Sequence, residues 1–355
     1  MRHMRNLFLS LFFILIAGVP TFLNAAKNVQ EPQATYTKTI RQLRKDGYKG
    51  IDKALASFNK ILKEDPNFLE AHISAADALL LKYEFSKRKN TAWLHQALGH
   101  LDICVEKEPN FFVAYFKRAI LYFNLNKPDQ AVKNIKKALK IYPEYLEARI
   151  LYLQYLLSSN KAEKAKAFAD ESLKYFPKDP APLKFFGDVF CRAHAYEDAI
   201  RYYNRVLHFV TNAPYTHLAL GKIYQTQGKL NLAIQHYAKA IKLEPKLYEA
   251  HFNLGYCYSK RNKIDKAIYH LEFYSKKFPN DVSVLNNLAL LYEQSGQSQK
   301  AKLAWLKTKE KAKEKSYKER AERHLYRLIH QNEKSNAAKN KKSPTKKGDH
   351  HEKKK

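Results

Sequence analysis

A 34-residue period runs through most of this chain and constrains its fold more than any other feature. Alanine recurs at this step without a gap, at Ala131, Ala165, Ala199, Ala233, Ala267 and Ala301. Glycine keeps the same step at Gly187, Gly221 and Gly255. A fixed period of this size indicates a stacked repeat array, in which each unit buries its apolar face only against its neighbours. A chain of this kind is expected to present an extended surface.

The residues inside one period resemble the tetratricopeptide repeat. The family's spacing of L-G-x-x-Y, A-x-x-x-F, A and P is matched by Leu220, Gly221, Tyr224, Ala233, Tyr237, Ala240 and Pro245. The next period repeats it from Leu254 to Pro279, and more divergent units lie on either side. The resemblance implies an all-α, right-handed superhelical solenoid of about eight tandem helix–turn–helix repeats over residues 35–313. The second repeat is nine residues longer than the others, which predicts an insertion near residues 84–92.

The small residues of each period are expected where two helices cross closely, because a larger side chain would overpack the contact. Each proline of the period directly follows a predicted helix, which its ring cannot continue. Most of the 24 tyrosines and 20 phenylalanines then fall on packing positions. The three cysteines, Cys104, Cys191 and Cys257, also lie at or near packing positions, which favours a structural role.

The first 26 residues have the three-part layout of a secretory signal peptide. Arg2 and Arg5 precede an apolar run from Leu7 to Val19, and the stretch from Pro20 to Ala26 ends in small residues. The apolar run is short for a bilayer span, which needs about 20 residues. We therefore expect export to the periplasm or cell envelope, with a short linker at 27–34. The alternative is an inner-membrane anchor formed by an uncleaved N-terminal segment.

The chain is strongly basic, with 64 Lys and Arg against 34 Asp and Glu and a formal charge of +30. Residues 301–355 alone hold 19 basic and 7 acidic side chains. Residues 314–333 are predicted to form a capping helix, and residues 334–355 a disordered lysine-rich tail, because the tail has too little apolar surface to fold. Its candidate polyanion-binding residues are Lys341, Lys342, Lys346, Lys347, Lys353, Lys354 and Lys355.

No catalytic motif of the G-x-S-x-G, Walker, H-E-x-x-H or C-x-x-C type occurs in the sequence. Cys191 and His194 are spaced to share a helix face, but two ligands do not make a zinc site. His217 and His251 occupy one repeat position, and His236 and His270 another, so the period itself explains these pairs. The sequence thus predicts no enzyme activity, no metal site and no cofactor.

In tetratricopeptide-repeat proteins, the first helix of each repeat lines a concave groove with its second, fifth, ninth, twelfth and thirteenth positions. The resemblance therefore implies a partner-binding groove for a protein or peptide. Its candidate residues are Phe116, Ile120, Phe123, Ile150, Lys184, Arg192, Leu218, Lys222, Phe252, Tyr256, Lys260 and Asn286. The alternative is that some of these aromatic side chains pack between neighbouring helices. A chaperone-type carboxylate clamp is excluded, since Lys184 is followed by Asp188 and the next repeat has Ala219.

These observations predict a non-enzymatic scaffold or adaptor of the cell envelope that binds a partner protein or peptide in its groove. One alternative is a polyanion-binding protein that attaches to lipopolysaccharide, anionic lipid or a wall polymer through its lysine-rich tail. Another is a regulatory subunit of a wall-modifying enzyme. Nucleic acid is a less favoured partner, because little of it lies on the export route. The inserted loop of the second repeat is either a partner contact or a plain extension of two helices.

Overall fold

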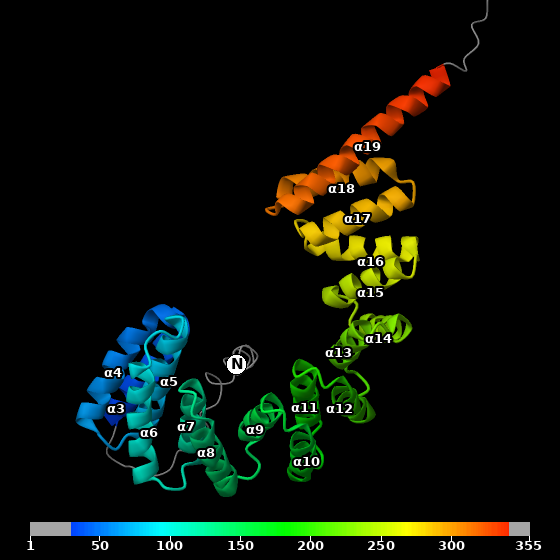
Figure 1. The fold of residues 1–355 in the computed structure, drawn as a ribbon. Coiled ribbons are helices and arrows are strands. Elements are labelled where there is room, and N and C mark those ends of the chain that lie inside the picture. Colours follow the sequence, from blue (N-terminus) through cyan, green and yellow to red (C-terminus); the bar gives the residue numbers. More distant parts are fainter. Residues whose placement is uncertain (1–29, 341–355) are drawn as a thin grey trace, which may run out of the picture. The chain divides into compact units, whose positions relative to one another are not determined.

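The computed structural model describes residues 30–340, with side chains described for residues 31–330. Within residues 30–340 all regular structure is helical, so the predicted all-α repeat fold is confirmed (Figure 1). The predicted signal peptide and the seven tail lysines lie outside the described residues. No helix within residues 30–340 is both long and apolar enough to cross a membrane.

The contacts divide the chain into two compact units that meet between Arg205 and Val206, inside one helix. Unit 1 holds four complete helical hairpins and most of a fifth, whose second helix contains the boundary. Their bounds are α3 Gln30–Asp46 and α4 Ile51–Glu64, α5 Leu69–Phe85 and α6 Ala92–Lys107, α7 Phe112–Asn124 and α8 Pro128–Ile141, α9 Leu146–Ser158 and α10 Ala162–Ser172, and α11 Ala181–Arg192 and α12 Tyr196–Phe209. Two short 3-10 turns, η2 Gly47–Gly50 and η3 Leu173–Tyr175, follow α3 and α10.

Unit 2 holds three further hairpins and a terminal helix. Their bounds are α13 Pro214–Thr226 and α14 Leu230–Leu243, α15 Tyr248–Lys260 and α16 Ile264–Lys277, α17 Val282–Gln294 and α18 Ser298–Lys311, and α19 Lys315–Asn340. Successive hairpins follow one another along this unit, with α19 last (Figure 1). The eight hairpins of the two units correspond to the eight repeats that the sequence period predicts.

The turn inside each regular hairpin contains one residue with a left-handed backbone. These residues keep the 34-residue step, at Asn126, Asn160, His194, Gly228, Asn262 and Gly296, with φ between 54° and 75°. The left-handed region costs little for glycine, and among the other residues asparagine and histidine adopt it more often than most, which explains the residue types found there. The period therefore fixes the backbone of the turn as well as the packing of the helices.

The repeat glycines lie where the two helices of a hairpin touch. A Cβ atom built on Gly187 would come within 2.8 Å of the Tyr203 ring, and one on Gly221 within 2.5 Å of the Tyr237 ring. At Gly255 the obstacle is Leu271, at 2.8 Å. No real Cβ tolerates such distances, so the helices could not cross this closely with a larger residue. The predicted close crossing is confirmed at these three positions.

The insertion of the second repeat lengthens its helices and its turn together. Helix α5 has 17 residues where α7 has 13, and α6 has 16 where α8 has 14. Six residues, 86–91, join α5 to α6, whereas three, 125–127, join α7 to α8. In the longer turn two consecutive residues, Lys87 and Arg88, have positive φ, and Arg88 pairs with Glu84 at 2.8 Å. The extra residues thus mainly extend the hairpin.

Helix α19 packs against the last hairpin through a narrow apolar stripe. Ala321, Leu325 and Leu328 are buried in one cluster with Trp305, whereas Ile329 is 41% exposed and takes no part in it. Glu293 of α17 links the three helices. Its carboxylate accepts hydrogen bonds from Trp305 Nε1 at 2.5 Å, His324 Nδ1 at 2.8 Å and Arg327 Nη2 at 2.5 Å, all given as N···O distances.

Helix α19 is longer than the sequence predicts. Its backbone continues to Asn340, so residues 334–340, which were expected to begin the disordered tail, are helical. This stretch is poor in large apolar side chains but rich in residues such as alanine and lysine with good helix propensity, which extend an existing helix at little cost.

Candidate functional site

The twelve predicted groove residues fall into two groups according to their exposure. Six are exposed or half-buried, namely Lys184, Arg192, Lys222, Phe252, Tyr256 and Lys260. The other six are buried, which is a correction to their predicted place on an open groove: Phe116, Ile120, Phe123, Ile150, Leu218 and Asn286. Each of the six exposes 7% or less of its surface, and such side chains have little left to offer a partner.

Packing between neighbouring helices explains this burial. Phe116 meets Tyr145 edge-on, with ring centroids 4.9 Å apart, and belongs to the same apolar core as Ile120 and Phe123. Leu218 lies in the core of unit 2 beside Tyr237. Asn286 is covered from α19, where Arg320 Nη1 lies 3.5 Å from its side-chain oxygen. For the aromatic residues of unit 1, the packing alternative is the one that the structure supports.

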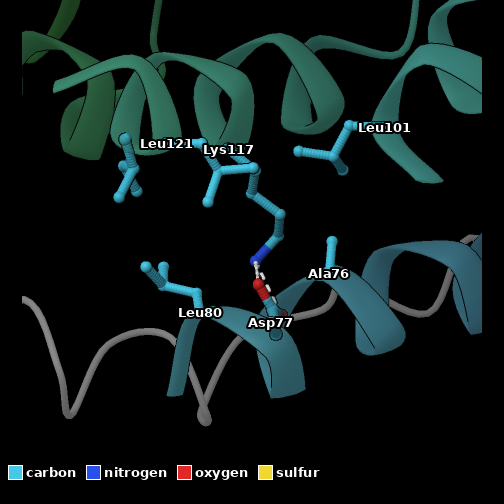
Figure 2. Close-up of a pocket in the computed structure, with 7 residues that line it drawn as sticks. Ala76, Asp77, Leu80, Leu101, Lys117 and Leu121 are labelled. Carbon is cyan, nitrogen blue, oxygen red and sulfur yellow. Dashed lines mark hydrogen bonds and ion pairs between the residues drawn. The ribbon is translucent and has the colours of Figure 1, made fainter. Parts of the chain in front are cut away.

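The groove side of unit 1 also holds an ion pair that the sequence did not single out. Asp77 of α5 occupies the ninth position of the second repeat, and Lys117 reaches it from α7 (Figure 2). The Lys117 ammonium donates to both carboxylate oxygens, at 2.7 and 2.8 Å. Figure 2 shows the pair between the apolar side chains of Ala76, Leu80 and Leu121.

This pair is a structural element rather than a ligand site. The cavity beside it measures about 10 Å³, which is room for roughly one water molecule. Burial raises the pKa of the Asp77 carboxyl, and the charge of Lys117 opposes that shift. The two charges are thus balanced against each other inside the unit, and the pair orients α5 against α7.

In unit 2 several groove positions of α13 and α15 remain accessible, although Leu218 of α13 is buried. Lys222 of α13 forms an ion pair with Glu249 of α15 at 2.5 Å. Tyr256 is half-buried, and the Lys260 ammonium lies 5.5 Å from its ring centroid. Phe252, also half-buried, packs on Tyr274 at 5.3 Å. We call the surface formed by Lys222, Glu249, Phe252, Tyr256 and Lys260 the α13–α15 face.

The two predicted groove residues on α11 behave differently from each other. Lys184 pairs with Asp188 one turn later, at 3.0 Å, and Tyr203 donates its hydroxyl to the same carboxylate at 2.6 Å. Arg192 is exposed. Because Lys184 is already paired with an anionic neighbour, it is poorly placed to hold a terminal carboxylate.

Three histidine pairs recur at one place in the repeat. The Nδ1 atoms are 2.9 Å apart in His72–His100, 3.1 Å in His217–His236 and 3.0 Å in His251–His270. The sequence reveals the second and third pairs by their period. The first is hidden because the insertion separates His72 from His100 by 28 residues instead of 19. The nine extra residues of the longer hairpin account for this difference. Once they are allowed for, His72 and His100 occupy the same repeat positions as the other two pairs.

The hydrogen bonds around two of these pairs determine which nitrogen carries the proton. The Nε2 atoms of His72 and His251 lie 3.0 and 3.2 Å from the carbonyl oxygens of Pro66 and Pro245. A carbonyl can only accept, so each Nε2 is protonated and each neutral ring accepts at Nδ1. The partner histidine, His100 or His270, must then donate its own Nδ1–H. Each such pair is joined by one Nδ1–H···Nδ1 hydrogen bond.

Burial makes one histidine of each pair a weak base. It lowers the pKa of His100, His236 and His270 to about 4, and the charge of the neighbouring histidine acts in the same direction. Nowhere in residues 30–340 do three or more His, Cys, Asp or Glu side chains gather as metal ligands would. Each histidine pair joins the two helices of one hairpin.

The geometry defines a scaffold of tandem helical hairpins whose accessible polar and aromatic groups lie on helix faces. Comparison with known protein families identifies the kind of repeat. Tetratricopeptide-repeat models match residues 112–145 and 249–281, and a model described as a TPR repeat matches residues 226–260. The chain is a tetratricopeptide-repeat protein. No curated protein matches the sequence significantly.

Three solved structures illustrate the likeness, and one of them, with a TM-score above 0.5, supports the fold. The crystal structure of yeast Tom70 matches with a TM-score of 0.53 and 16% identity, over 93% of this chain and 72% of that one. YrrB, described as a TPR protein with an unusual peptide-binding site, gives 0.43 and 20% over 53% and 97% of the two chains. PilF of Pseudomonas aeruginosa gives 0.44 and 15% over 60% and 97%. At such identities the likeness concerns the fold alone.

Proposed function

We propose that this protein is a non-enzymatic scaffold of the cell envelope that binds a segment of a partner protein on its α13–α15 face. The carrying observation is that Phe252 and Tyr256 remain half-buried on this face while the exposed cations Lys222 and Lys260 flank them. Half-buried aromatic groups lose little entropy on binding, and the cations orient a polar chain beside them. Peptide binding is a common use of such grooves between helices.

The fold is a second argument for the same function. Tetratricopeptide repeats generally act as non-enzymatic scaffolds for protein interactions, and the described residues offer one face suited to that role. The proposed envelope location rests on the sequence of residues 1–26, where two arginines precede an apolar run and small residues.

Binding by purified protein tests the proposal. The chain from Ala26 onward is incubated with detergent-solubilised envelope and washed at about 0.1 M and about 0.5 M salt, where screening differs strongly. We expect a defined protein to survive the second wash. The double variant Phe252→Ala/Tyr256→Ala should lose it. The matched control is Tyr269→Ala/Tyr326→Ala, which removes two tyrosines that are 62% and 66% exposed elsewhere in the unit.

A second variant separates binding from folding. Lys222→Glu/Lys260→Glu changes only exposed side chains and should preserve the helical circular dichroism spectrum. If this variant and the aromatic variant both retain the partner as well as the Tyr269→Ala/Tyr326→Ala control does, the α13–α15 face is not the binding surface. The proposal is then wrong.

The lysine-rich C-terminus favours one further candidate, binding to lipopolysaccharide, anionic lipid or a wall polymer. Residues 341–355 contain seven lysines against two acidic residues. Because α19 continues to Asn340, truncation after this residue removes the seven lysines and leaves the helix. Material that binds only the full chain and leaves at high salt would favour this function. Wall hydrolysis that changes when the protein is added would instead indicate a regulatory subunit of a wall-modifying enzyme.

A further inference from the structure

A second pocket lies in unit 1, on α8, α9 and the start of α10, away from the groove positions of the repeats. Its volume is about 300 Å³, at the lower end of the range for ligand sites in proteins. Three lysines line it, Lys136 from α8 and Lys161 and Lys164 at the start of α10. We call it the α8–α10 pocket.

The charges of this pocket are unbalanced. All three lysines are exposed, and within residues 31–330 none of them has a carboxylate within ion-pair distance. The one acidic residue of the lining is Asp129, in the first turn of α8. Three ammonium groups therefore face one carboxylate.

The walls of the pocket are aromatic and apolar. Tyr152 and Tyr155 of α9 lie with nearly parallel rings, at 15° and 6.2 Å between centroids. The Lys161 ammonium is 5.5 Å from the Tyr155 ring, which holds this lysine at the rim. Val132 and Leu156 complete the apolar part of the lining. A ligand that fills this space needs an apolar or aromatic body as well as negative charge.

We propose that the α8–α10 pocket binds an acidic segment of a partner polypeptide, with carboxylates at the three lysines and an aromatic side chain between the tyrosine rings and the apolar wall. The proposal rests on the scaffold function above and adds a second surface to it. The observations favour a peptide over a phosphate polymer. Asp129 repels dense negative charge but accepts a hydrogen bond from a peptide N–H, and a phosphate chain would leave the aromatic wall unused.

The test uses a short fluorescein-labelled peptide that alternates glutamate with phenylalanine, and follows its anisotropy with the full chain. The variant Lys136→Glu/Lys161→Glu/Lys164→Glu should lower the affinity about tenfold or more, because three attractive charges become repulsive. The control Lys242→Glu/Lys246→Glu/Lys302→Glu makes the same change in net charge at exposed lysines of unit 2 and should lower it far less. Equal losses in the two variants would show attraction by net charge alone and overturn the proposal.

Two further arms test the identity of the ligand. A peptide that alternates glutamate with serine should bind several-fold more weakly, since it lacks the aromatic group; equal binding would refute the role of the wall. Inorganic triphosphate should compete poorly, and strong competition would assign the pocket to phosphate instead. The triple variant with glutamine at the three lysines guards against misfolding and should also weaken binding. Variants of the α13–α15 face should bind this peptide normally, so the two proposals fail separately.

Discussion

The same repeat positions have opposite fates in the two units of this protein. In unit 1 the groove side of α5 and α7 is closed by apolar packing and by the enclosed Asp77–Lys117 pair. In unit 2 the corresponding side of α13 and α15 carries an exposed ion pair and half-buried aromatic groups. For α7, α13 and α15 the difference lies in the side chains, because each of these helices has 13 residues. One repeat thus presents a closed, apolar side in unit 1 and a partly open side with polar and aromatic groups in unit 2.

The comparison predicts that breaking the two ion pairs will have very different costs. Lys117→Ala should destabilise the protein by about 2 kcal/mol, because it leaves the Asp77 carboxylate, whose side chain is only 21% exposed, without its partner. Lys222→Ala should cost less than about 1 kcal/mol, since its pair with Glu249 is exposed to solvent. Urea denaturation followed by circular dichroism measures both.

Replacing both members of the buried pair is the control. Asp77→Leu/Lys117→Met removes the two charges together and should recover most of the lost stability, because no unpaired charge remains. If the double variant is as unstable as Lys117→Ala, the pair contributes shape or contacts that the apolar residues cannot replace, and the electrostatic account is wrong.

Two glycine substitutions sharpen the packing side of the comparison. Gly221→Ala should destabilise unit 2 by about 1–3 kcal/mol, because the new methyl group would meet the Tyr237 ring. Gly99→Ala, in α6 of unit 1, has open space around its Cβ and should stabilise by about 0.5–1 kcal/mol through helix propensity. Thermal unfolding would give opposite shifts in Tm. Shifts of the same sign would contradict the close crossing at Gly221.

The histidine pairs predict a loss of stability in acid. The pKa of His100, His236 and His270 is about 4 in the folded state and about 6.5 in the unfolded chain. Between these values the unfolded state binds more protons, so stability falls as pH drops from about 6.5 to 4. Solvent screening limits the effect to on the order of 1 kcal/mol per pair.

Unit 2, with two pairs, should lose more than unit 1, with one. Urea titrations at pH 7 and pH 5 on the chain and on His236→Gln/His270→Gln would check this. The variant should show a smaller difference between the two pH values. An unchanged difference would mean that other groups govern the acid response.

The smallest effect concerns stability at the α13–α15 face. Glu249→Gln should change the free energy of unfolding by less than about 0.5 kcal/mol, because the pair with Lys222 is at the surface. It should nevertheless alter partner binding, since it frees the Lys222 ammonium. Denaturation and the envelope pull-down, run on the same preparation, measure both. A large loss of stability would show that this face is part of the fold in the way that the Asp77–Lys117 pair is.

The repeat fold was predictable because its signals are local. Gly221 and Tyr237 lie 16 residues apart, and their contact recurs with the period at Gly187 and Tyr203. The exposure of Phe116 or Leu218 was not predictable in this way, because it depends on which side chains the neighbouring helices supply. His72 and His100 escaped notice for a third reason, since the insertion shifted their spacing. The α8–α10 pocket draws its lysines from two hairpins and has no signature within one period.

The left-handed turn residues recur every 34 residues and so mark equivalent positions at which the repeat array can be divided into units. Gly228 and Asn262 occupy equivalent turns with the same backbone geometry, one 34-residue step apart. Deleting residues 229–262 would remove α14 and α15 and connect α13 directly to α16 through one turn. Every later helix would keep its place in the 34-residue period. Removing or adding whole 34-residue units therefore keeps the turns of the array in register, and the number of units sets the length of the array.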